Sequence, residues 1–208
     1  LVKALRKTGG NPFFVNEFLK TLYQENLLTF NPEIIRWQWD MEAIKALDIT
    51  DNVVDLMIGK LRKLPEGTQK VLSLVACIGN QFDLNTLSLT YEKESSAAFG
   101  DLLPAVREGL VLPANESEAE GIDPGMYGFL ILNYKFLHDR VQQAAYSLID
   151  ESQKQAIHLK IGRLFLANTP PEYRLERVFD LVDHLNVGIS LIDDEAEKLE
   201  LAKLNLEA

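Results

Sequence analysis

The element order is clearest at residues 134–146, which have the sequence YKFLHDRVQQAAY. The first four residues end a strand-like run of large apolar and aromatic side chains. After His138, apolar residues such as Val141 and Ala144 recur at helical spacing, which predicts a helix that extends to about Ile149. A strand is therefore expected to lead directly into a helix, with His138 at the junction.

Upstream of this junction, apolar stripes and capping residues predict short helices, followed by two strands around a polar loop. A helix start at Thr50–Asn52 is followed by the expected helices Thr68–Ile78, Asp83–Thr90 and Ser95–Gly109. The expected strands are Leu110–Ala114 and Met126–Leu137, and the acidic loop between them is Asn115–Gly125. Three helices, a strand, a loop and a second strand form the order of a winged-helix domain.

The N-terminal region predicts a helix and a small hairpin. Asn11-Pro12 is a strong helix start, because Asn caps free amides and Pro suits the first helical position. Strand-like runs at Leu27–Phe30 and Ile35–Trp39 flank a turn. Trp37 and Trp39 alternate along the second run, so one of the two is expected to pack inward.

The C-terminal region is expected to be wholly helical. Amphipathic spacing predicts helices at Gln153–Ala167, Leu175–Val187 and Glu195–Leu206. Consecutive antiparallel helices of this kind are typical of a helical-repeat array, although no sequence repeat of fixed period is present. The predicted fold class is therefore mainly α, with a small β-hairpin, a winged-helix domain and a TPR-like helical region.

The composition narrows the class of function. The formal net charge is −10, and an acidic chain repels phosphate backbones, which argues against a nucleic-acid partner. The one cysteine, Cys77, predicts a buried, inert thiol and a reducing, cytoplasmic setting. No apolar run approaches the roughly 18–20 residues of a membrane span. The missing initiator Met and a helical pattern that continues to the last residue are expected of a segment from a longer protein.

The sequence contains no P-loop signature, dinucleotide fingerprint, H-E-x-x-H motif or nucleophile elbow. No catalytic residue and no metal ligand are therefore predicted. His158 and His184 lie within helical patterns and are expected to be packing or surface residues.

His138 allows two interpretations. A helix N-terminus exposes backbone amides and a partial positive charge, which favour an anion and a neutral imidazole that donates one N–H. His138 could thus hold a phosphate, with Arg140 nearby. The alternative is a structural histidine whose ring nitrogens are satisfied by a carboxylate or carbonyl at a domain junction.

Two segments carry a resemblance to a known family. Residues 8–17, TGGNPFFVNE, resemble the Gly-x-Pro segment of STAND-class signalling ATPases, which are related to the AAA+ fold. Residues 136–146 resemble the winged-helix motif that follows it in that family. Residues 37–40, 49–54 and 76–84 also resemble large bacterial sensor kinases with a Ser/Thr-kinase-like domain before the ATPase and GAF and histidine-kinase modules after it.

The resemblance implies residue roles and a division into domains. It implies that residues 1–50 end an ATPase lid, residues 51–150 form a winged helix and residues 151–208 begin a TPR-like region. Pro12 would touch the adenine side of a nucleotide and His138 the β-phosphate of ADP, with Asn11 and Arg140 beside them. ADP or ATP with Mg²⁺ would bind to an upstream P-loop domain of the full-length parent, and no cofactor is expected for the segment alone.

The function implied is that of a regulatory segment. It would couple the ADP/ATP state of the upstream P-loop domain to downstream helical-repeat and kinase modules of the same chain. Two alternatives stay open. In a DNA-binding winged helix the recognition helix would be Ser95–Gly109, whose only basic residue is Arg107. A pure protein-interaction scaffold would show no response to nucleotide in the intact parent.

Overall fold

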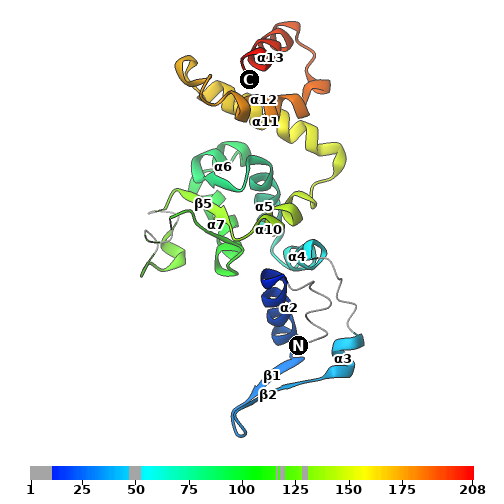
Figure 1. Ribbon diagram of the computed structural model, residues 1–208. Coiled ribbons are helices and arrows are strands. Elements are labelled where there is room, and N and C mark those ends of the chain that lie inside the picture. Colours follow the sequence, from blue (N-terminus) through cyan, green and yellow to red (C-terminus); the bar gives the residue numbers. More distant parts are fainter. Residues whose placement is uncertain (1–10, 47–52, 116, 118–119, 128–130) are drawn as a thin grey trace. The chain divides into compact units, whose positions relative to one another are not determined.

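The computed structural model describes residues 11–46, 53–115, 117, 120–127 and 131–208. The chain divides into two compact units, Leu1–Lys60 and Leu61–Ala208, which are described separately below (Figure 1). The described residues form ten α-helices and two small antiparallel sheets, so the predicted mainly α fold is confirmed. Within these residues, no helix has both the length and the apolar character that crossing a membrane requires.

The first unit contains a helix, a hairpin and two further helices. They are α2 (Pro12–Gln24), β1 (Leu28–Asn31), β2 (Arg36–Trp39), α3 (Met41–Ala46) and α4 (Val53–Leu61), the last of which ends one residue into the second unit. Phe14, Phe18 and Leu22 form the buried stripe of α2 at helical spacing. The predicted helix start at Thr50–Asn52 and residues 8–10 of the Gly-x-Pro segment lie outside the described residues.

The hairpin confirms the predicted strand pair but corrects the expected burial. Leu28 pairs with Trp39 and Phe30 with Trp37, so one face of the ribbon is apolar throughout. Trp37 is 51% and Trp39 59% exposed, and the prediction that one of them packs inward is wrong. Tyr23 and Phe30 meet the Trp37 ring only edge-on, at centroid distances of 6.0 and 5.4 Å, and leave half of it in solvent.

The second unit begins with three helices interleaved with three short strands. They are α5 (Glu66–Ile78), β3 (Gln81–Asp83), α6 (Leu84–Tyr91), α7 (Ser95–Arg107), β4 (Val111–Pro113) and β5 (Asn133–Phe136). The sheet has the order β3-β5-β4, and both pairings are antiparallel. β3 is an addition to the predicted elements. Asp83 ends it and caps α6 as predicted, because its Oδ1 accepts the Thr86 amide at 2.8 Å.

The central strand is shorter than the predicted run Met126–Leu137. Pro124–Met126 form the 3₁₀ helix η1, which Asp123 caps by accepting the Gly125 amide at 2.8 Å. Residues 128–130 lie outside the described residues, and β5 starts only at Asn133. An Asp-Pro-Gly sequence favours a turn, which accounts for η1 at the predicted start of this strand.

The rest of the second unit is helical, as predicted. It comprises α10 (Asp139–Tyr146), α11 (Glu151–Asn168), η2 (Pro171–Tyr173), α12 (Val178–Val187), η3 (Ile189–Leu191) and α13 (Glu195–Glu207). The core that α11, α12, α13 and the residue after η3 share is apolar and consists of Leu159, Val178, Val182, Leu185, Ile192, Leu201 and Leu204. A Cβ atom on Gly162 would come within 2.8 Å of Leu185, and one on Gly188 within 2.6 Å of Leu159. Both glycines therefore permit a close approach to the neighbouring helix.

Candidate functional site

The N-terminus of α2 holds the first pair of predicted site residues, and both are exposed. Asn11 has extended backbone angles, and its side-chain oxygen accepts the Phe14 amide at 3.1 Å. Pro12 occupies the first helical position, where its missing N–H leaves no helical hydrogen bond unmade. The Asn11 side chain is thus engaged in capping, and the exposed Pro12 ring is the apolar surface at this helix end.

A buried ion cluster fixes α2 one turn further along. Glu17 is only 3% exposed, and its two carboxylate oxygens bind the ammonium groups of Lys20 and Lys60. Burial by itself raises the pKa of Glu17, but the two lysines together outweigh burial, so the pKa lies below its ordinary value. The carboxylate therefore stays charged and ties α2 to α4 within the first unit.

His138 lies where β5 ends and α10 begins, as predicted. Its backbone is extended, and its Nδ1 accepts the Arg140 amide at 3.1 Å, so the imidazole itself is the N-cap of α10. The His138 carbonyl also accepts the Val141 amide at 2.8 Å. Because Nδ1 accepts a hydrogen bond, the proton of the neutral ring lies on Nε2. Nε2 is therefore the ring nitrogen that could donate to an anion.

The charged residues beside His138 act in opposite directions on an anion. Asp139 occupies the first turn of α10 and is exposed, which suits the helix dipole but repels phosphate. Arg140 is exposed too, and its Nη1 donates to the side-chain oxygen of Gln143 at 2.8 Å. The Arg140 guanidinium thus lies along its own helix and would have to leave Gln143 to contact an anion at the helix end.

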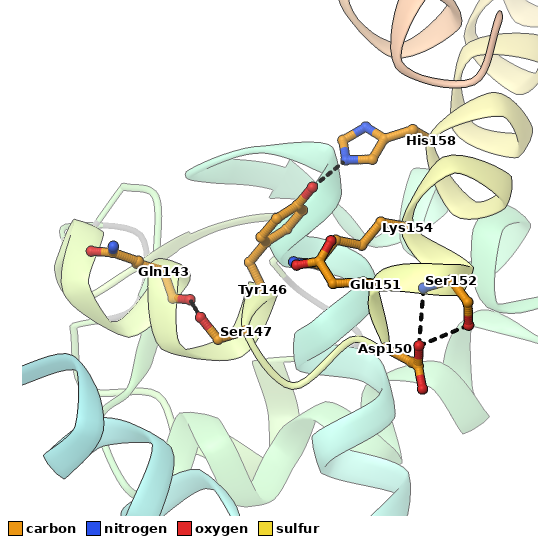
Figure 2. A network of polar contacts seen from close by, with 8 residues as sticks. All are labelled: Gln143, Tyr146, Ser147, Asp150, Glu151, Ser152, Lys154 and His158. Atoms are coloured by element: carbon orange, nitrogen blue, oxygen red, sulfur yellow. Dashed lines mark hydrogen bonds and ion pairs between the residues drawn. The ribbon is translucent and has the colours of Figure 1, made fainter. Parts of the chain in front are cut away.

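The second unit holds α10 rigidly. Val141, Ala144 and Ala145 are fully buried, and the side-chain amide of Gln142 donates to the Ala76 carbonyl of α5 at 3.1 Å. At the far end of α10, Ser147 Oγ donates to the Gln143 carbonyl at 2.8 Å (Figure 2). His138 is therefore attached to a well-packed element, as a binding residue requires.

A polar network connects the end of α10 to α11 (Figure 2). Tyr146 Oη lies 3.1 Å from His158 Nε2, and the Lys154 ammonium lies 4.5 Å from the centre of the Tyr146 ring. Lys154 also pairs with Glu151, and Asp150 caps α11 by accepting the amide and hydroxyl of Ser152. Cys77 belongs to the apolar cluster beside Tyr146, so the predicted burial of its thiol is confirmed, and burial raises its pKa to about 12.

The same network contains an arrangement that the sequence did not reveal. His158 Nδ1 lies 2.9 Å from His184 Nδ1, and His184 is only 8% exposed. The sequence predicted two separate packing or surface histidines, 26 residues apart, and the structure brings them into hydrogen-bond contact. The indication available from sequence was Gly162 within α11 and Gly188 after α12, since a glycine inside a helical pattern can mark a close helix contact.

Among the predicted site residues that the structure describes, His138 lies at a helix N-terminus, and its Nε2 is a donor of the kind that phosphate oxygens accept from. The described residues offer no group of three or more His, Cys, Asp and Glu side chains placed to hold a metal ion. Asn11 and Pro12 belong to the first unit, and His138 and Arg140 to the second. Each pair thus forms a separate local arrangement at its own helix end.

Sequence comparison identifies the relatives of this chain. It is 32% identical, over an alignment of 241 positions that covers 98% of its length, to the hybrid signal transduction histidine kinase G of Dictyostelium discoideum. The chain is homologous to a segment of that kinase. It is also 19% identical, over an alignment of 196 positions that covers 92% of its length, to the peroxide stress-activated histidine kinase mak3 of Schizosaccharomyces pombe (strain 972 / ATCC 24843).

These relatives confirm the predicted signal-transduction histidine-kinase context. The chain spans only 7% of the length of the first kinase and 8% of the second. No protein-family model and no solved structure matches the chain. The relatives therefore set the context of this segment, and its own role must be argued from its residues.

Proposed function

We propose that this chain is a regulatory segment of a nucleotide-switched signal-transduction kinase, and that it couples the ADP/ATP state of a P-loop domain to kinase modules in the same parent protein. The observation that carries the proposal is the homology of almost the whole chain to a segment of a signal-transduction histidine kinase. A segment that lacks catalytic motifs but has histidine-kinase relatives is expected to relay a signal.

We further propose that residues 51–150 form a winged helix, that residues 1–50 end an ATPase lid and that residues 151–208 begin a TPR-like array. The order α5-β3-α6-α7-β4-β5 and the sheet order β3-β5-β4 support the winged helix. The close packing of α11 on α12 at Gly162 and Gly188 supports a helical array. Arg107 is the one basic residue within α7, so the structure gives no reason to prefer DNA binding.

In this proposal His138 binds the phosphate side of the nucleotide and Pro12 contacts its adenine side. A bound ADP supplies the negative charge of its phosphates. His138 Nε2–H donates to the β-phosphate, while Nδ1 keeps its bond to the Arg140 amide and holds the ring in place. The positive end of α10 favours the same charge. A charge-assisted hydrogen bond contributes about 1.5–3 kcal/mol, which shifts a closed/open equilibrium by roughly ten- to a hundred-fold.

The test separates the two nitrogens of His138 in the full-length parent. His138→Asn keeps an oxygen near the Nδ1 position, so it preserves the cap of α10 and removes only the Nε2 donor. We expect ADP to dissociate roughly ten- to a hundred-fold faster from this variant, with thermal stability nearly unchanged. Stopped-flow release of a fluorescent ADP analogue measures the rate.

Two further variants serve as controls in this experiment. His138→Gln places an amide near the Nε2 position, and we expect it to restore slow release in part while the cap of α10 is weakened. Arg140→Ala removes a guanidinium that is bound to Gln143, and its effect on release should be smaller than that of His138→Asn. ADP release at the wild-type rate from His138→Asn would contradict the proposed role of His138.

A further inference from the structure

The most unusual polar arrangement in the second unit is a line of three side chains from three helices. Tyr146 of α10 contacts His158 Nε2 of α11 at 3.1 Å, and His158 Nδ1 contacts His184 Nδ1 of α12 at 2.9 Å. Phe165 closes the arrangement, with its ring edge-on to His184 at a centroid distance of 5.3 Å. These three polar groups thus connect α10, α11 and α12 beside the apolar clusters of this unit.

The number of protons on this chain is restricted by its geometry. Two facing Nδ1 atoms form a hydrogen bond only when one carries a proton and the other does not. With both imidazoles neutral, Tyr146 Oη–H can donate to His158 Nε2, and His158 Nδ1–H to His184 Nδ1. The hydrogen bonds can also run in the opposite direction, with His184 Nδ1–H donating to His158 Nδ1 and His158 Nε2–H donating to Tyr146 Oη. If both rings are doubly protonated, two N–H groups and two positive charges face each other at Nδ1, and the bond is lost.

The surroundings favour the neutral state. Burial, with a smaller contribution from the neighbouring His158, lowers the pKa of His184 to about 4, although Asp183 and Asp180 act against both. Burial also lowers the pKa of His158, with a smaller contribution from the positive charge of Lys154. The other groups around the pair are Tyr146 and Cys77, whose own pKa values burial raises, Glu151, which pairs with Lys154, and Arg177, which lies over the Phe165 ring.

The position of the pair makes its protonation matter for the fold. His184 lies beside Leu185, which packs closely against Gly162, and α11 and α12 share one apolar core. Protonated imidazoles in this contact would be largely buried charges that have lost their mutual hydrogen bond, which is costly. When α12 separates from α11, water solvates both rings and they can take up protons.

We propose that the chain Tyr146–His158–His184 is a proton-sensitive contact that keeps α12 packed on α11 while the imidazoles are neutral and loosens this packing as the pH falls. The contact does not involve His138 or a nucleotide, so it stands apart from the proposed ADP-dependent switch. It controls how often α12 and the following α13 separate from α11, the first long helix after α10.

The direction of the pH effect follows from proton linkage. A histidine whose pKa is lowered in the packed state binds fewer protons there than in the opened state, so acid favours opening. For His184 the effect develops as the pH falls from its ordinary value of 6.5 and levels off near about 4. Between pH 7 and pH 5, His184 alone multiplies the opening constant by about 20, and His158 adds to this factor.

Hydrogen exchange followed by mass spectrometry on the 208-residue chain tests this contact. After correction for the chemical exchange rate, we expect the opening constant of the α12 amides to rise at least about 20-fold from pH 7 to pH 5. His184→Asn keeps a polar atom near Nδ1 but cannot titrate, and it should remove most of this rise. The amides of α5 in the same sample serve as the internal reference.

Ser190→Ala is the matched control. It removes the hydrogen bond from Ser190 Oγ to Gln155 at 3.1 Å, which also reaches α11, but it removes no titrating group. Its pH dependence should equal that of the wild type. Tyr146→Phe deletes the hydroxyl at the other end of the chain and should change the pH dependence less than His184→Asn.

A measurement on the wild type tests the proposal even if the His184→Asn variant does not fold. The chain has only three histidines, so their ring signals can be resolved by NMR. We expect the His184 ring to titrate well below 6.5 while the α12 amides remain protected. Titration of His184 at its ordinary value, or an unchanged pH dependence in folded His184→Asn, would overturn the proposal.

Discussion

The hairpin of the first unit and the sheet of the second unit use the same pattern of alternating aromatic residues with opposite results. In β5, Tyr134 and Phe136 are 0% and 2% exposed. In β2, Trp37 and Trp39 are each more than half exposed. β5 lies between two other strands, and Phe82 and Phe99 pack on Tyr134 at centroid distances of 5.9 and 6.1 Å. Alternation therefore identifies an apolar face, but burial needs a second layer that only tertiary structure supplies.

Truncation of the central aromatic residue of the sheet should have the largest effect. Tyr134→Ala removes a fully buried ring and should lower the free energy of unfolding of the second unit by about 3–5 kcal/mol. Tyr134→Phe isolates the hydroxyl, which donates to the Ile131 carbonyl at 3.1 Å, and should cost about 1 kcal/mol. Urea unfolding followed by circular dichroism measures both. A loss below 1 kcal/mol for Tyr134→Ala would mean that burial of this ring contributes no more to stability than the exposed rings of the hairpin do.

The first unit contains a buried ionic contact in addition to the apolar stripe of α2. Glu17→Gln should lower its stability by about 1.5–3 kcal/mol, because two charge-assisted bonds are lost and Lys60, whose side chain is only 18% exposed, is left without its carboxylate. Since the pKa of Glu17 is lowered, its stabilising effect is full at neutral pH. It is lost as the pH falls from the ordinary value of 4.5 through the lowered pKa. Glu17→Gln should therefore also remove this acid sensitivity.

The two lysines provide the control for Glu17. Lys20 is 60% exposed and Lys60 only 18%, so Lys60→Met should cost more stability than Lys20→Met. Tryptophan fluorescence during urea unfolding measures all three variants, because both tryptophans of the chain lie in the first unit. Equal losses for the two lysine variants would show that Glu17 acts through surface charge alone.

Local sequence rules predicted the helix boundaries well because the responsible groups are close in sequence. Asn11 and Asp83 cap α2 and α6 through amides three residues ahead, and the start of α10 depends on His138 and the residues after it. The same rules located His138, Arg140, Asn11 and Pro12 at helix N-termini. Contacts within one turn of helix are set by spacing, and spacing is visible in the sequence.

Features that depend on distant partners could not be predicted in this way. β3 has only Phe82 as a large apolar residue, and it forms a strand because it pairs with β5, about fifty residues later. The His158–His184 contact depends on how closely α11 and α12 approach at Gly162. Among the described residues, no second layer packs over Trp37 and Trp39, which leaves both rings more than half exposed. Each of these three features depends on which elements pack against one another. The periodicity of apolar residues within one element does not determine this packing.

The smallest expected effect lies on the hairpin itself. Trp37→Ala removes two edge-on ring contacts, to Tyr23 and Phe30, but little buried area, and should cost about 0.5–1.5 kcal/mol of the stability of the first unit. The fluorescence of the remaining Trp39 monitors unfolding, and far-UV circular dichroism of the helices in the second unit should not change.

Trp39→Ala is the matched control on the same strand and face, and it leaves the Trp37 ring contacts in place. It should cost less than Trp37→Ala, about 0.5 kcal/mol or below, as for an exposed surface position. A loss of about 3 kcal/mol for either tryptophan would equal the loss expected for the buried Tyr134. The difference in side-chain exposure between the hairpin and the sheet would then not explain their contributions to stability.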